Sequence, residues 1–435
     1  MSRPHSRASR LAGVGRRVAV VGGAVAAQLS QALLSFGLQA IVAHTLGAGG
    51  LGTYALIYSV IVTSSALTGG LVGDSLTVLD RSQPPIRAAL QHWALSSTTA
   101  ASVLTAAALV GFGVVDLVTG VIVAAASATF LLEGLLRRIL MAELRFWSVV
   151  VVDGVSLVAS LATLGVWAAA ATLDLDAMLV ALVVGQVAGT LAGLPLLSAE
   201  DRRWSWSRAD LRAVWSYGSL RAVQQTIRPL LLTLVRVLVI VEAGREAFGR
   251  LEAARIYVAP GILVIQGLGT YLFASYARDR TSPLSRLVRR ADRTAVAMAV
   301  AALAAGALAS ALAGPLGPVI TGSSFSIDPV EALAWAAFAA ATAANAPYAS
   351  LAAVRARQAA VIRNAVLVAV ATLAVAAGLL LTGAPVVLAP LVIAGGLVVQ
   401  ALVLRNRILP GSEQAAATPS GTAADDVAGR SEAGP

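Results

Sequence analysis

The chain has 435 residues, of which 58% are hydrophobic and only 12% are charged, and its mean hydropathy is +0.81. No soluble core needs that much apolar surface, so the composition excludes a soluble protein and predicts an all-α polytopic membrane protein. Cysteine is absent and there are three histidines, so we expect no disulfide, no metal site and no cofactor. The net charge of +10 marks cytoplasmic loops in such a protein, and we expect no nucleic-acid partner.

The N-terminal segment 1–17 is polar and basic, as in a signal peptide, but the apolar run that follows, 18–43, is too long for a signal sequence. We therefore predict an uncleaved first membrane helix. Its polar residues Gln28, Gln31, Ser35 and Gln39 are spaced i, i+3, i+7 and i+11, so they share one face of that helix.

Eleven further apolar segments follow in the sequence and predict twelve membrane helices in all. These segments are 51–72, 92–115, 117–136, 147–171, 177–197, 214–252, 254–276, 295–320, 330–352, 365–381 and 386–404. The connections after even-numbered helices are rich in arginine. Among the others, arginine occurs only where helix 7 leads into helix 8, at Arg245 and Arg250, and acidic residues balance it there. The positive-inside rule therefore places both termini in the cytoplasm.

The same arginine pattern divides the chain into parts. We predict two six-helix halves, 18–198 and 214–408, joined by a cytoplasmic central loop, 199–213. A basic cytoplasmic N-terminus, 1–17, precedes them. The tail 409–435 is rich in alanine, glycine, serine and proline, and we expect it to be disordered in the cytoplasm.

An internal repeat relates the two halves. At a constant offset of 197 positions, Gly47 aligns with Gly244 and Gly52 aligns with Gly249, each pair flanked by apolar helices. Glycine at these positions suits a helix end with positive φ and a tight entry into the next helix. We therefore predict that the halves are parallel repeats related by an axis along the membrane normal.

The segment 214–252 is apolar enough to cross a membrane, yet it is interrupted by charged and polar side chains. The polar residues on its predicted inward face are Arg221, Gln224, Gln225, Arg228 and Arg236. The first four are spaced i, i+3, i+4 and i+7. An arginine near the bilayer centre costs about 3 kcal/mol, so this face must line a protein interior or an aqueous cavity. The repeat offset places Gln28 on Gln225 and Gln31 on Arg228, so polar residues coincide in both halves.

The connection between the first two helices resembles that of the polysaccharide-biosynthesis (O-antigen or teichoic type) flippases of the multidrug/oligosaccharidyl-lipid/polysaccharide exporter (MOP) superfamily. The matching residues are Leu46, Gly47, Gly52 and Tyr54. The second half matches this motif only at its glycines. The resemblance, over about 15–408, implies a V-shaped fold and alternating access. It also implies flipping of a polyprenyl-diphosphate-linked oligosaccharide for cell-surface polysaccharide biosynthesis in the cell membrane.

A lipid-linked sugar diphosphate fits the predicted polar face. Guanidinium groups bind phosphate oxygens in pairs, so we expect Arg221, Arg228 and Arg236 to hold the diphosphate. We expect Gln28, Gln31, Gln39, Gln224 and Gln225 to line the sugar path. Membrane lipids are the other expected partners, with a glycan polymerase or glycosyltransferases of the same pathway, and we expect the protein to act as a monomer.

Two acidic residues within the predicted helices are candidates for ion coupling. Asp153 lies about two turns into the fifth helix, and Glu133 lies about one turn from the end of the fourth. Each is expected either to carry a coupling proton or to pair with an arginine, which for Glu133 is Arg137 at i+4. Glu252 and Arg255, at the start of the eighth helix, are expected at the outer surface.

Three alternatives remain open besides a non-transporting scaffold, in which arginines within membrane helices would be unexpected. The first is an ion-coupled multidrug or small-molecule exporter of the same superfamily, although a cationic drug favours an acidic and aromatic cavity. The second is a flippase for lipid-linked peptidoglycan precursors, which usually has fourteen helices. The third is a membrane glycosyltransferase or polymerase. Short outer loops and the lack of a nucleophile–histidine or metal constellation argue against that third class, so we expect no enzyme.

Overall fold

A computed structural model describes residues 7–278, 282–322, 324–355 and 358–410, and every regular element among them is a helix. Most of the predicted disordered tail, and the first six residues, lie outside this part of the chain. The α-helices are α1 Arg7–Thr68, α2 Asp74–Val78, α3 Pro84–Gly111, α4 Leu117–Ala142, α5 Phe146–Ala170, α6 Leu175–Gly193, α7 Leu211–Arg278, α8 Leu284–Ala311, α9 Ala313–Thr321, α10 Pro329–Arg355, α11 Gln358–Leu381 and α12 Leu388–Val403. Short π- and 3₁₀-helical segments are η1 Gly69–Gly73, η2 Leu194–Leu196 and η3 Leu404–Ile408.

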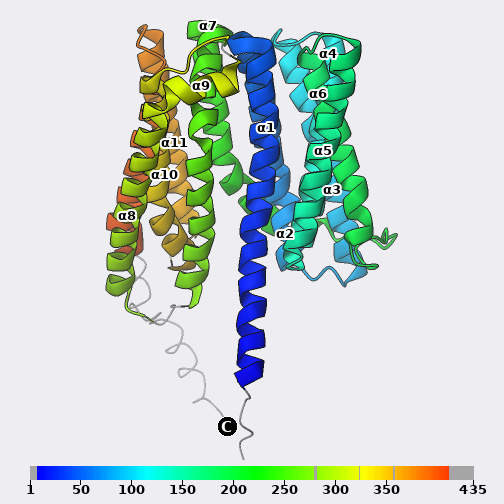
Figure 1. Cartoon of the computed structure of the whole chain (residues 1–435). Helices are drawn as coiled ribbons and strands as arrows, with labels where there is room; N and C mark the ends of the chain where they lie inside the picture. The colour runs from blue at the N-terminus through cyan, green and yellow to red at the C-terminus, as the bar shows by residue number, and fades with distance from the viewer. Residues whose placement is uncertain (1–6, 279–281, 323, 356–357, 411–435) are drawn as a thin grey trace, which may run out of the picture.

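The helices form two groups with α1 and α7 between them (Figure 1). In the first half α3, α4, α5 and α6 pack on one another and on α1. In the second half α8, α11 and α12 pack around α10, which also contacts α7. The contact between α1 and α7 is the most extensive of all helix pairs, so these two helices join the halves.

Both α1 and α7 are long helices with a sharp kink at a glycine. Gly47 has φ 65° and ψ −168°, and Gly244 has φ 87° and ψ 166°. The positive φ expected at these two positions is therefore present, and it permits the chain to reverse without a Cβ clash. Each of the two predicted connections is a kink at one glycine instead of a loop. Predicted helices 1 and 2 therefore form one kinked helix, α1, and predicted helices 7 and 8 form another, α7.

The second predicted helix is longer than its apolar run, which ends at Val72. The chain continues through the π-helical η1 into α2 and ends at Val78. Asp74 lies in this extension, where the sequence suggested a loop. Its carboxylate is bound by side chains from two other helices. The ninth predicted helix also differs. The arginine-rich segment before it is already helical from Leu284. The helix is also interrupted between α8 and α9, close to Pro315, which has no backbone N–H to donate.

Eight helical stretches of the described residues are long and apolar enough to span a membrane. One of them, Ala26–Val78, has 53 residues and contains the kink at Gly47. The chain is thus a multi-pass membrane protein. The count of twelve spans and the cytoplasmic position of both termini stay predictions.

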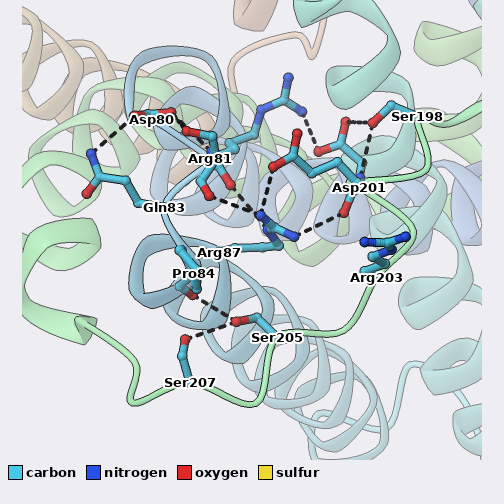
Figure 2. Close-up of polar contacts among 12 residues, drawn as sticks. Asp80, Arg81, Gln83, Pro84, Arg87, Ser198, Asp201, Arg203, Ser205 and Ser207 are labelled. Carbon is cyan, nitrogen blue, oxygen red and sulfur yellow. Dashed lines mark hydrogen bonds and ion pairs between the residues drawn. The ribbon is translucent and has the colours of Figure 1, made fainter.

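The linker, which is the part of the predicted central loop that precedes α7 (199–210), is attached to the first half. Figure 2 shows it lying across the loop before α3, where the Arg81 guanidinium is 3.1 Å from the Asp201 carboxylate. The hydroxyl of Ser205 donates to the carbonyl of Pro84 at 2.9 Å. Gln91 accepts from the backbone N–H of Ser205 and donates to the carbonyl of Arg203, both at 2.9 Å. The linker is therefore bonded to the first half, and α7 begins at Leu211.

Candidate functional site

The first part of α7, before its kink, has two different surfaces. Exposed Val223, Leu230, Leu234, Val237 and Val241 follow one another at helical spacing and form an apolar stripe suited to lipid. On the other side of the helix lie Arg221, Gln224, Gln225 and Arg228, which turn toward polar groups of neighbouring helices. The predicted polar face therefore points into the protein and away from the apolar stripe.

Arg228 lies near the midpoint between the start of α7 and its kink. Its Nη2 donates to the hydroxyl of Thr342 at 3.2 Å, and its guanidinium carbon lies 5.6 Å from the centre of the Phe338 ring. Both contacts come from α10, in the second half. The side chain is exposed, and no carboxylate of the described residues pairs with it. Arg228 thus presents an uncompensated positive charge on the side of α7 opposite the apolar stripe.

Arg221 and Gln225 belong to a polar network centred on Asp74. One carboxylate oxygen of Asp74 accepts from Arg221 Nε and from Gln225 Nε2, both at 2.7 Å. The other oxygen accepts from Arg138 Nη1 at 3.0 Å. Arg221 also donates to Gln224 at 2.9 Å. Because Asp74 and Arg138 belong to the first half and the others to the second, this network ties the halves together beside the start of α7.

Small residues bring the backbones close beside this network. A Cβ at Gly70 would lie 2.4 Å from Ala222 Cα, and one at Gly218 would lie 2.1 Å from the carbonyl oxygen of Leu71. The η1 segment therefore packs directly on the first turns of α7. Sequence reasoning assigned Asp74 and Arg138 to loops. The signal it did not use is that Asp74 directly follows a glycine-rich stretch that permits such an approach.

Arg236 lies in a buried network nearer the kinks. It donates to Glu252 Oε1 at 3.2 Å, and Arg255 Nε donates to the same oxygen at 2.5 Å. Arg255 Nη2 donates to the side-chain oxygen of Gln39 at 2.7 Å, which connects α7 to α1. Glu252 is only 1% exposed, so the expectation that Glu252 and Arg255 are outer-surface groups is wrong. The carboxylate is buried because two guanidinium groups compensate its charge.

The glutamines predicted along the first helix occupy different environments. Gln28 is exposed, Gln31 lines a cavity inside the first half, and Gln39 is buried in the network with Arg255. The structure therefore does not bring these three glutamines together with Arg228 in one site.

The cavity beside Gln31 has a volume of about 50 Å³ and contains both acidic candidates. Asp153 pairs with Arg137, at 2.9 Å between Oδ1 and Nε, and accepts from the Ser30 hydroxyl at 2.5 Å. Glu133 accepts from Ser156 at 2.8 Å, while its second oxygen is buried with no hydrogen-bond partner among the described residues. Arg137 therefore pairs with Asp153 and not, as the i+4 spacing suggested, with Glu133.

The four glycines of the predicted repeat meet at the kinks. A Cβ at Gly52 would lie 2.1 Å from the carbonyl oxygen of Arg245, and one at Gly249 would lie 1.7 Å from that of Ala48. Gly52 and Gly249 are 197 positions apart, which is the offset of the internal repeat, and so are Ala48 and Arg245. The two contacts are therefore equivalent under the internal symmetry, which supports parallel repeats.

No protein-family model and no curated protein matches the sequence. Solved structures do match it. A multidrug resistance MATE family transporter of the MOP superfamily, in an inward-facing conformation, has a TM-score of 0.65 at 14% identity over 90% of this chain and 100% of its own. The lipid II flippase MurJ, in an inward closed conformation, has a TM-score of 0.67 at 11% identity over 87% of this chain and 85% of its own.

The chain has the fold of the MOP transporters. A third similar structure is a MOP superfamily transporter from Pyrococcus furiosus, described by the reverse polarity of its binding pocket. Its TM-score is 0.61 at 12% identity, over 91% of this chain and 95% of its own. All three similar structures are of transporters or flippases. At such low identity the shared fold does not determine what this chain carries.

Proposed function

We propose that this protein flips a lipid-linked oligosaccharide across the cell membrane, and that Arg228 binds the diphosphate of the carrier lipid. The supporting observation is which arginines of α7 form an ion pair with a carboxylate. Arg221 and Arg236 each pair with a carboxylate, whereas Arg228 is exposed and pairs with none in the described part of the chain. An uncompensated arginine within a membrane helix is costly, and an anionic substrate would remove that cost.

The contacts of Arg228 leave its charge available. Phe338 supports the guanidinium through a cation–π contact, and Thr342 accepts one hydrogen bond. Arginine has five N–H donors, so the remaining ones can bind two oxygens of a diphosphate in parallel. The aromatic contact restricts the side chain and so reduces the entropy lost when the anion binds.

Gln224 is the polar neighbour of Arg228 one turn closer to the start of α7. Its side-chain oxygen accepts from Arg221 and from Gln358 Nε2, the latter at 3.1 Å, and these bonds fix the amide. An amide held in this way presents donors to sugar hydroxyls. From the other half we place exposed Gln28 on the same path, whereas Gln31 lines the separate small cavity of the first half.

Glu133 is the better candidate for a coupling proton, because Asp153 is already bound by Arg137 and Ser30. The free oxygen of Glu133 is buried beside a cavity large enough for a few water molecules. Arg137 and Asp153 are the other charged groups lining that cavity. A proton reaching Glu133 would change the charge of the first half without disturbing the Arg137–Asp153 pair.

The second candidate is an exporter of small molecules, which the similarity to a MATE transporter keeps open. The two functions differ in what accumulates when the gene is deleted. For the flippase, lipid extracts of the deletion strain will contain more polyprenyl-diphosphate-linked oligosaccharide than the parent. Unchanged lipid intermediates and surface glycan, with increased sensitivity to a cationic drug, would favour the exporter.

A further inference from the structure

The start of α8 displays four arginines on one face. Arg286, Arg289, Arg290 and Arg293 are spaced i, i+3, i+4 and i+7, and all four are exposed. Together with Thr294 they line a hollow of about 340 Å³. The group covers about 10 Å along the helix axis. We call this surface the arginine face.

Acidic residues of the described part of the chain do not neutralise Arg286, Arg289 or Arg293. The only acid of α8, Asp292, is bound by Arg405 through both carboxylate oxygens, at 2.7 and 2.9 Å, and by the Tyr348 hydroxyl at 2.7 Å. Arg290 lies over the Tyr276 ring at 5.8 Å. Arg286, Arg289 and Arg293 form no ion pair with a carboxylate of the described residues, so these three side chains keep their positive charge uncompensated there.

The arginine face continues directly into an apolar surface. Arg289 and Arg293 are followed by Val296, Val300 and Leu303 in steps of four, three, four and three residues, which keeps all five on one line along the helix. The three apolar residues are 65%, 59% and 47% exposed, as expected for a side that faces lipid tails. Cationic groups at one end and an apolar stripe beyond match a phospholipid in both chemistry and direction.

We propose that the arginine face is a binding site for an anionic phospholipid of the leaflet on the side where α1 begins. The phosphate would lie in the hollow between Arg286, Arg289 and Arg293, and an acyl chain would follow Val296, Val300 and Leu303. Clusters of four or more arginines beside a membrane helix attract anionic headgroups in this way. Soluble anions fit less well, because the apolar stripe would contribute nothing to their binding.

Native mass spectrometry of the full-length protein tests this site with two probes that share their acyl chains, dioleoyl phosphatidylglycerol and dioleoyl phosphatidylcholine. The wild type is expected to retain phosphatidylglycerol in preference to phosphatidylcholine. In R286Q/R289Q/R293Q the affinity for phosphatidylglycerol should fall about tenfold or more. The matched control R202Q/R203Q/R208Q removes three exposed linker arginines, and therefore the same charge, and should bind as the wild type does.

One further variant and one competing headgroup complete the experiment. R286K/R289K/R293K keeps the charge and should retain most of the preference for phosphatidylglycerol. Glycerophosphoglycerol, the same headgroup without acyl chains, should not compete at equal concentration. Equal retention of both phospholipids by the wild type would overturn the proposal. So would equal losses in the triple glutamine variant and its control, or full competition by the deacylated headgroup.

Discussion

Gly52 lies directly against the backbone carbonyl of Arg245, which is the residue after the kink in α7. The equivalent contact places Gly249 against the carbonyl of Ala48, one residue after the kink in α1. Each glycine thus lets the backbone of one half touch the kink of the other. Because the opposing atoms are backbone, neither contact can adjust by a change of rotamer. These two contacts hold the halves together at the kinks.

Gly52→Ala should separate the halves at this point. A Cβ 2.1 Å from a carbonyl oxygen forces the backbones apart, and overpacking of this kind typically costs about 1–3 kcal/mol. We expect a lower melting temperature and a strong loss of transport. Gly49→Ala is the control, because a Cβ there meets nothing within 4 Å. Equal behaviour of the two variants would show that the contact does not matter.

Asp74→Asn should weaken the second connection between the halves. The change removes the negative charge between Arg138 and Arg221, which then face each other without compensation. Both arginines are about one-third exposed, so we expect a cost of about 1–2 kcal/mol, less than for a fully buried pair. Thermal unfolding of Asp74→Asn, Arg221→Gln and the double variant measures the coupling.

Asp80→Asn is the control for that cycle. Asp80 is exposed, and among the described residues its carboxylate is bound only by Ser82 and Gln83 of its own loop. Additive effects of Asp74→Asn and Arg221→Gln, with no coupling energy, would contradict a role for Asp74 as a connection between the halves.

Gln91→Ala should release the linker from the first half. Gln91 makes two hydrogen bonds to the linker backbone, at Arg203 and Ser205, whereas the Arg81–Asp201 pair is a partly exposed ion pair of small value. Limited digestion with trypsin, which cleaves after arginine, is therefore expected to cut at 202–203 faster in Gln91→Ala than in Asp201→Asn. If Asp201→Asn is cleaved faster, the ion pair and not the amide holds the linker.

Glu133→Gln and Asp153→Asn should have different effects. Glu133→Gln removes a proton-binding group but keeps the acceptor for Ser156, so we expect a folded protein whose transport no longer responds to a pH gradient. Asp153→Asn leaves Arg137 buried without a carboxylate partner, and we expect a loss of stability of about 3 kcal/mol. Transport in vesicles with and without an imposed pH gradient, with melting curves, separates these results. A normal pH response in Glu133→Gln excludes it as the coupling group.

Sequence reasoning predicted the helical fold, the positive φ at Gly47 and Gly244, and the inward direction of the polar face of α7. These follow from local rules, because periodicity and glycine conformation are properties of short segments. The partners of the polar residues did not follow. Asp74 meets Arg221 across 147 positions, and Thr342 belongs to an apolar helix whose sequence gives no sign of a contact with Arg228. Such pairs depend on how the two halves pack.

The most direct test of the flippase hypothesis measures the leaflet that holds the lipid-linked oligosaccharide in spheroplasts of a deletion strain. A glycan-cleaving enzyme that cannot cross the membrane reports the outer-leaflet fraction. Wild type and Arg250→Ala should restore this fraction, since Arg250 is exposed and pairs with Glu246 on its own helix. Arg228→Ala should restore it roughly 10–100-fold less, the loss expected for one or two charge-assisted hydrogen bonds, and Arg228→Lys should restore part of it. Full restoration by Arg228→Ala, expressed at the wild-type level, would contradict the central claim.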